Sequence, residues 1–118
     1  MNRKSHARRI ATQVRRRLEE GSVDHIQLEK LYAGYANVPR VPLFVRRARK
    51  LFPNLNCGLA SILLQHELQE GEVVNGKYGA ENHTFLLIHG DTVVDITADQ
   101  YGGPSIYVGT LREPWALP

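Results

Sequence analysis

The feature that most constrains this fold is a change of hydrophobic pattern at Gly71. Before it, apolar residues recur every three or four positions, as on one face of a helix; after it, short β-branched and aromatic runs alternate with Gly, Asn, Asp and Pro. Helices followed by strands are typical of an α+β fold in which a sheet packs on helices. At 118 residues the chain is long enough for one modest core, so we expect a single domain over residues 1–118.

Four helices and an antiparallel sheet are expected. Gly21 suits the end of a first helix, and Ser22 suits the N-cap of a second that ends between residues 34 and 37. Pro42 suits the first turn of a third helix, and Gly71 the end of a fourth, amphipathic one. Besides the second, the expected helices cover residues 5–20, 42–51 and 57–70, and the expected strands cover residues 72–78, 83–89, 92–97 and 105–110. A basic helical part, residues 1–52, thus precedes a part with the fourth helix and the sheet, residues 53–118.

Charge is distributed unevenly along the chain. Residues 1–50 carry 13 Lys or Arg against 4 Asp or Glu, whereas residues 51–118 carry 2 against 8. Either the basic half binds an anionic partner, or the two halves attract each other within one chain or between chains. The sequence leaves both interpretations open.

Composition disfavours several classes of protein. Cys57 is the only cysteine, which excludes an intramolecular disulfide framework and any zinc motif built on several cysteines. A zinc site made from Cys57, His66, His83 and His89 would lack close paired spacing, so we expect no metal and no organic cofactor. No apolar run is long enough to cross a bilayer, and none follows the basic amino terminus as in a secretory signal. We therefore expect a cytoplasmic protein without a membrane partner.

Cys57 stands where a reactive thiol is expected. The unpaired N–H groups and the positive dipole end of a helix N-terminus stabilise a thiolate. A cysteine nucleophile also needs a base, commonly a His that is oriented by a carboxylate. His83 opens the run HTFLLI, and Asp95 lies in VVDIT, where a carboxylate among valine and isoleucine needs a partner. A small buried cysteine is the simpler interpretation of Cys57 alone, but the three residues together favour one catalytic site.

The order NCGLAS, HTFLLI and VVDITAD, within residues 54–102, resembles the core of the transglutaminase-like and papain-like thiol enzymes. This resemblance implies the same core fold, with Cys57 as nucleophile, His83 as base and Asp95 as the residue that orients the base. It also implies a cysteine-dependent hydrolase or acyltransferase: a protease, amidase, deamidase or transglutaminase-like enzyme. Such an enzyme acts on a peptide, protein or small amide substrate through a thioester intermediate.

Two features depart from these families. Residues 51–56 contain no glutamine of the kind that completes the papain oxyanion hole, and Gly58 stands where transglutaminase-like enzymes have an aromatic residue. The oxyanion donors would then be the N–H of Cys57 and a side chain such as Asn54 or Asn56, or another backbone group. Hydrolysis, transfer and deamidation all stay open.

The loop between the second and third strands decides whether the triad can form. A two-residue turn at Gly90 and Asp91 would place His83 and Asp95 on opposite faces of the sheet, because side chains alternate along a strand. We therefore predict an odd loop or a bulge, with residue 85 or 83 opposite residue 95.

Other residues and functions compete with this interpretation. His89 is an alternative base and Asp99 an alternative carboxylate, but both lie at turn positions that favour non-catalytic roles. His66 is expected on the exposed side of its helix. The arginine clusters favour an alternative function, a nucleic-acid or protein-binding module that uses the basic N-terminal helices, although no nucleic-acid motif accompanies them. A thiol-hydrolase fold that is inactive and serves as an interaction module is a third interpretation.

Overall fold

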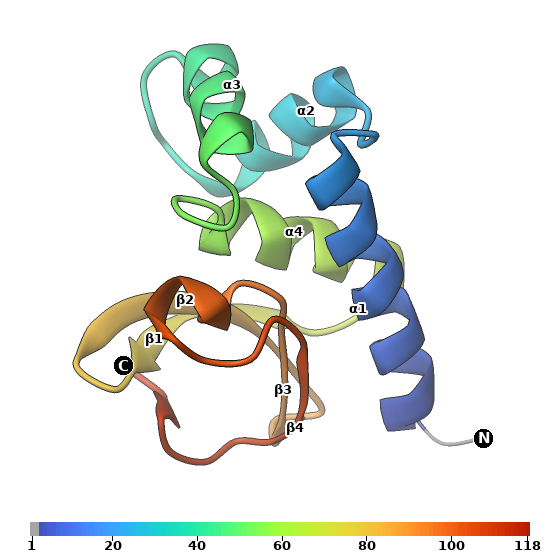
Figure 1. The fold of residues 1–118 in the computed structure, drawn as a ribbon, viewed down its shortest axis with the longest axis vertical. Coiled ribbons are helices and arrows are strands. Elements are labelled where there is room, and N and C mark those ends of the chain that lie inside the picture. Colours follow the sequence, from blue (N-terminus) through green and yellow to red (C-terminus); the bar gives the residue numbers. More distant parts are fainter. Residues whose placement is uncertain (1–2) are drawn as a thin grey trace.

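The computed structural model describes residues 3–118, in which four helices precede a five-stranded antiparallel sheet (Figure 1). The helices are α1 (Arg3–Glu20), α2 (His25–Tyr35), α3 (Val41–Leu51) and α4 (Cys57–Leu68). The strands are β1 (Glu72–Tyr78), β2 (Glu81–Ile88), β3 (Thr92–Asp95), β4 (Tyr107–Thr110) and β5 (Trp115–Ala116), and a 3₁₀ helix η1 (Ala98–Tyr101) follows β3. The expected α+β fold, with a Cys-bearing helix packed on an antiparallel sheet, is confirmed.

Two helix ends and two short elements differ from the sequence prediction for local reasons. Helix α2 begins after Asp24 and not after Ser22, because the Asp24 carboxylate accepts the N–H of Gln27 at 2.9 Å. Helix α4 ends before Gly71, because Gln69 adopts the left-handed conformation with φ 57°. Strand β5 and helix η1 were not predicted, since elements of two and four residues show no readable periodicity.

The sheet has the order β4-β3-β2-β1-β5 and buries both faces. Leu86, Ile88 and Val94 pack against the helices on one face. Phe85 and Trp115 belong to a second apolar cluster on the other face, where the sheet curls and the C-terminal segment lies (Figure 1). Alternate residues of β2 therefore enter different cores, as the two-residue period of a strand requires.

Helix α4 is the centre of the fold. It packs on β1, β2 and β3, while α1 and α2 contact its other sides and α3 packs on α2 (Figure 1). Residues 59–64 are all buried, so the prediction of an amphipathic helix was wrong: a helix covered on every side is apolar all round. Full burial of one Leu side chain contributes about 1.5–3 kcal/mol, and Leu59, Leu63 and Leu64 are each fully buried. These contacts hold the helix that begins at Cys57.

The two oppositely charged halves attract each other within this chain. Arg15 of α1 binds both carboxylate oxygens of Asp99 at 2.9 Å, and Arg17 forms an ion pair with Glu67 of α4. One of the two interpretations of the charge asymmetry is thereby observed. No helix within residues 3–118 combines the length and the apolar character needed to cross a bilayer.

Candidate active site

Cys57 is the first residue of α4, and Asn56 is its N-cap. The first N–H groups of an α-helix have no acceptor inside the helix, so the thiol lies at the positive end of the helix dipole. Asn56 is fully buried, and its Nδ2 donates to the carbonyl oxygens of Ala48 and Asn54, both at 2.7 Å. These bonds hold the turn before Cys57 against α3. Cys57 itself is half-buried.

The loop between β2 and β3 has an odd length, as predicted. Ile88 is opposite Thr92, which leaves residues 89–91 as a three-residue loop and, by continuation of the ladder, places residue 85 opposite residue 95. His83 and Asp95 are therefore diagonal neighbours on one face. His83 Nε2 and Asp95 Oδ2 are 2.6 Å apart, and the two side chains are 0% and 2% exposed.

His83 lies on the face of the sheet away from α4, next to Phe85 of the second cluster. The His83 side chain nevertheless interacts with the Cys57 thiol. Strand β3 pairs with β2 only from Leu86 to Ile88, so it does not pair with β2 at Thr84. Ser61 Oγ donates to the carbonyl oxygen of Thr84 at 3.3 Å, and the Thr84 backbone also interacts with the Cys57 thiol.

The electrostatics of the pair favour a charged form. Since Nε2 of His83 binds Asp95, Nδ1 is the nitrogen left for Cys57; it is buried and makes no full hydrogen bond within residues 3–118, a looseness common in substrate-free sites. Burial alone would lower the pKa of His83, but Asp95 and Cys57 raise it to about 9. Burial alone would raise the pKa of Cys57, but His83 and Thr84 lower it below its ordinary value. Each group thus stabilises the charged form of the other, a thiolate at Cys57 and an imidazolium at His83.

Asp95 is held by more than His83. Its Oδ2 also accepts the indole N–H of Trp115 at 2.8 Å, and its Oδ1 accepts the backbone N–H of Thr97 at 2.9 Å. These bonds orient the carboxylate, which in turn orients the His83 ring. No role for Trp115 was predicted from the sequence. The sequence offers one hint, because a buried indole N–H needs a hydrogen-bond acceptor. That rule does not identify the acceptor.

Aromatic rings surround the thiol and the imidazole. The ring of Tyr101 packs edge-on to His83, with 5.4 Å between centroids. On the α2 side, a Cβ on Gly58 would lie 3.5 Å from the ring of Tyr32 and 3.6 Å from the ring of Tyr35. Two aromatic side chains of α2 therefore lie against Gly58.

The competing base and carboxylate lie elsewhere. Asp99 binds Arg15, so Asp95 is the carboxylate at His83. His89 is exposed in the loop and pairs with Glu70 at 3.0 Å.

The two predicted oxyanion side chains differ in what they can donate. Asn56 uses its Nδ2 for two backbone carbonyl oxygens, so it has no free N–H for a substrate. Asn54 is exposed in the turn before Cys57, and its role stays a prediction.

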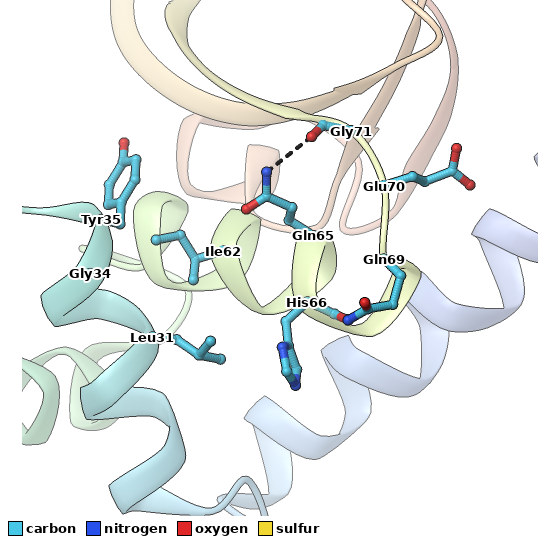
Figure 2. Close-up of a pocket in the computed structure, with 9 residues that line it drawn as sticks. All are labelled: Leu31, Gly34, Tyr35, Ile62, Gln65, His66, Gln69, Glu70 and Gly71. Atoms are coloured by element: carbon cyan, nitrogen blue, oxygen red, sulfur yellow. Dashed lines mark hydrogen bonds between the residues drawn. The ribbon is translucent and has the colours of Figure 1, made fainter.

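A groove of about 560 Å³ lies between α2, α4 and the turn into β1 (Figure 2). His66 is half-buried there, not exposed as expected, and its Nε2 contacts the side-chain amide of Gln27 at 3.2 Å. The lining residues are Leu31, Gly34, Tyr35, Ile62, Gln65, His66, Gln69, Glu70 and Gly71. Because Cys57, His83 and Asp95 do not line this groove, we locate the site by the geometry of these three residues.

Within residues 3–118, no three His, Cys, Asp or Glu side chains are grouped so that they could hold a metal ion. No protein-family model and no curated protein matches the sequence, and no solved structure matches the fold.

Proposed function

We propose that this protein is a cysteine-dependent hydrolase or acyltransferase of the papain-like or transglutaminase-like type, acting on an amide or related acyl group. The observation that supports this most is the buried hydrogen bond between His83 Nε2 and Asp95. It leaves Nδ1 of His83 without a partner and so available to a thiol at a helix N-terminus. Burial of a His and an Asp is costly without a purpose in packing or chemistry. Here the buried pair has a chemical effect, because His83 lowers the pKa of Cys57, as a nucleophile requires.

The first half-reaction would acylate Cys57. The thiolate sulfur attacks the carbonyl carbon, a carbon–sulfur bond forms, and the carbonyl π electrons move to the oxygen. Collapse of this intermediate restores the C=O bond and breaks the bond to the leaving group, which takes the proton carried by His83. Asp95 keeps the ring oriented and stabilises its protonated form.

The second half-reaction would release the acyl group. His83, now neutral, accepts a proton from water or from an acceptor amine, and the resulting nucleophile attacks the thioester carbon. The carbon–sulfur bond breaks, and Cys57 returns as the thiolate beside the imidazolium. Water yields an acid, whereas an amine yields a new amide, so the nucleophile decides between hydrolysis and transfer.

An acylation assay with p-nitrophenyl acetate tests the proposal without knowledge of the natural substrate. The wild type should release p-nitrophenolate and gain one acetyl group at Cys57, seen by intact mass, faster than a free thiol does at the same pH. Cys57→Ala should lose the labelling and His83→Ala most of the rate. A wild-type rate no greater than that of free cysteine would overturn the enzyme proposal and favour an inactive thiol-hydrolase fold.

A second candidate function is that of a binding module, in which α3 binds an anionic surface of a nucleic acid or a protein. Helix α3 contains no acidic residue and exposes Arg46, Arg47 and Lys50 beside Leu43, which is 46% exposed. Binding to a nucleic acid that weakens steeply with rising salt would support it. If the full chain binds no nucleic acid, or binds it independently of salt, this second function is contradicted and the enzyme proposal is the one that stays.

A further inference from the structure

An acyl transfer creates negative charge on the substrate oxygen, and this oxyanion is commonly bound by two donors. The N–H of Cys57, at the start of α4, can supply one. Asn56 has no free N–H. The second donor should be a side chain that is held rigidly beside the first turn of α4 and has no acceptor of its own.

Tyr32 of α2 has this position. Its ring stacks on Phe44 of α3, with 5.0 Å between centroids and 10° between planes, and the residue is 8% exposed. A Cβ added to Gly58 would lie 3.5 Å from the ring and 4.0 Å from the hydroxyl oxygen. The hydroxyl thus lies beside the turn that begins with Cys57. Burial, Tyr35 and the charge of Cys57 raise the pKa of Tyr32, so the hydroxyl keeps its proton beside a thiolate.

The Tyr32 hydroxyl makes no hydrogen bond within residues 3–118 and is not cut off from solvent. The other two tyrosines around Cys57 differ in this respect: Tyr35 donates to a β1 side chain at 2.8 Å, and Tyr101 donates to a β2 carbonyl oxygen at 3.1 Å. The side-chain Nε2 of Gln100, beside Tyr101, also has no acceptor, but it is fully buried. A substrate oxygen could reach it only after η1 moved.

We propose that the Tyr32 hydroxyl is the second oxyanion donor, acting together with the N–H of Cys57; this role rests on the function proposed above. As the carbon–sulfur bond forms and the carbonyl electrons move to oxygen, that oxygen accepts both hydrogen bonds. No proton leaves Tyr32, and collapse of the intermediate returns the electrons to the C=O bond. Gly58 has a matching role, because no side chain at this position comes between the hydroxyl and the reacting oxygen.

Two reactions of Cys57 separate an oxyanion donor from a structural residue. Acylation by p-nitrophenyl acetate passes through an oxyanion, whereas alkylation by iodoacetamide displaces iodide from a saturated carbon and does not. In Tyr32→Phe, the ring and its stacking on Phe44 are kept. We expect its acylation rate to fall by roughly 10²-fold, while its alkylation rate and the pH dependence of alkylation stay within about twofold of wild type.

Tyr35→Phe is the matched control, because it removes a hydroxyl from the same helix beside the same glycine, but one that already donates to β1. Both of its rates should equal those of wild type. Gln100→Met tests the competing donor and should also acylate normally. Thermal unfolding of each variant checks that it is folded.

Wild-type acylation in Tyr32→Phe would overturn the assignment, as would a loss confined to Gln100→Met. A parallel fall of acylation and alkylation in Tyr32→Phe would also overturn it, because that result indicates an altered thiolate. Failure of the proposed function is recognised separately: the wild type itself would then be alkylated but not acylated, and the role of Tyr32 would be lost with it.

Discussion

At the scale of single residues, the contacts of Cys57 matter more than its place at a helix start. A helix N-terminus lowers the pKa of a thiol, but burial of Cys57 acts in the opposite direction. The net lowering depends on His83, whose own pKa is raised to about 9 by Asp95 and Cys57 despite burial. The two shifts together define a pH range in which the thiolate and the imidazolium coexist.

The pH dependence of iodoacetamide alkylation tests this coupling. In the wild type the rate should rise with pH through a Cys57 pKa that lies below the ordinary value of a thiol, while His83, whose pKa is about 9, still carries its proton. In His83→Ala the thiol loses its counter-charge but stays buried, so the rise should move to higher pH. At pH 6.5 we expect the variant to react at least about tenfold more slowly. His89→Ala is the control and should match wild type. If the alkylation rate depended on pH in the same way in His83→Ala and His89→Ala, the coupling between His83 and Cys57 would be contradicted.

Trp115 is predicted to position Asp95 through its indole N–H. Trp115→Phe keeps an aromatic ring to stack on Tyr107, 3.9 Å away between centroids, but removes the 2.8 Å bond to Asp95 Oδ2. The free energy of unfolding should fall by about 1–2 kcal/mol in urea titrations. The acylation rate should fall by roughly tenfold, because the His83 ring is less firmly oriented. Tyr107→Phe keeps every bond to Asp95 and should acylate normally; a wild-type acylation rate in Trp115→Phe would show that the bond does not position Asp95.

At the scale of elements, the parity of one loop decides whether the site can exist. With residues 89–91 between the paired ends of β2 and β3, His83 and Asp95 share a face. Removal of one residue from this loop forces a register in which one strand presents its other face. A chain that lacks Gly90 should therefore lose Cys57 reactivity and unfold at lower temperature, since Leu86 and Val94 would no longer both face the helices.

Replacement of residues 89–91 by three other turn residues, Gly-Asn-Gly, is the matched control. It keeps the length of the loop and should keep the alkylation and acylation rates of wild type. If the shortened chain kept full reactivity, the register argument would be wrong.

At the scale of the whole molecule, Arg15 joins the basic helices to the site. Its guanidinium donates to the carbonyl oxygen of Ile96 at 2.8 Å and to Asp99, and it lies 4.7 Å over the ring of Phe52, in the turn before Cys57. One side chain thus connects α1, the segment after Asp95 and the turn before Cys57. This contact explains why one arginine of the first helix is buried.

Arg15→Met should lower the free energy of unfolding by about 2–4 kcal/mol, because the Ile96 carbonyl and the Asp99 carboxylate lose their donors. Arg16→Met, at the neighbouring exposed position, should change it by less than about 0.5 kcal/mol. Urea titrations of the two variants make the comparison. Equal stabilities would mean that the Arg15 contacts contribute nothing net.

Much of the fold and part of the site could be predicted because they depend on near neighbours. The start of a helix at Cys57 follows from the breaker sequence before it. Strand alternation places His83 and Asp95 on one face once the loop is odd, but Gly90 and Asp91 also suit a two-residue turn, so the structure decides the parity. Trp115 could not be predicted, since a two-residue strand has no pattern that points to its partner. Asn56 looked like a free donor, but its amide holds the turn against α3.

The sequence by itself determined the order of the four helices and the first four strands and the helix start at Cys57, because these follow from local periodicity and turn signals. Only the tertiary structure decided that His83 and Asp95 share a face, that α4 contacts Thr84, that Trp115 reaches Asp95 and that Tyr32 lies against Gly58. Those contacts join residues far apart in the chain. Their geometry depends on how the whole core packs, whereas a sequence pattern describes only residues that are near neighbours in the chain.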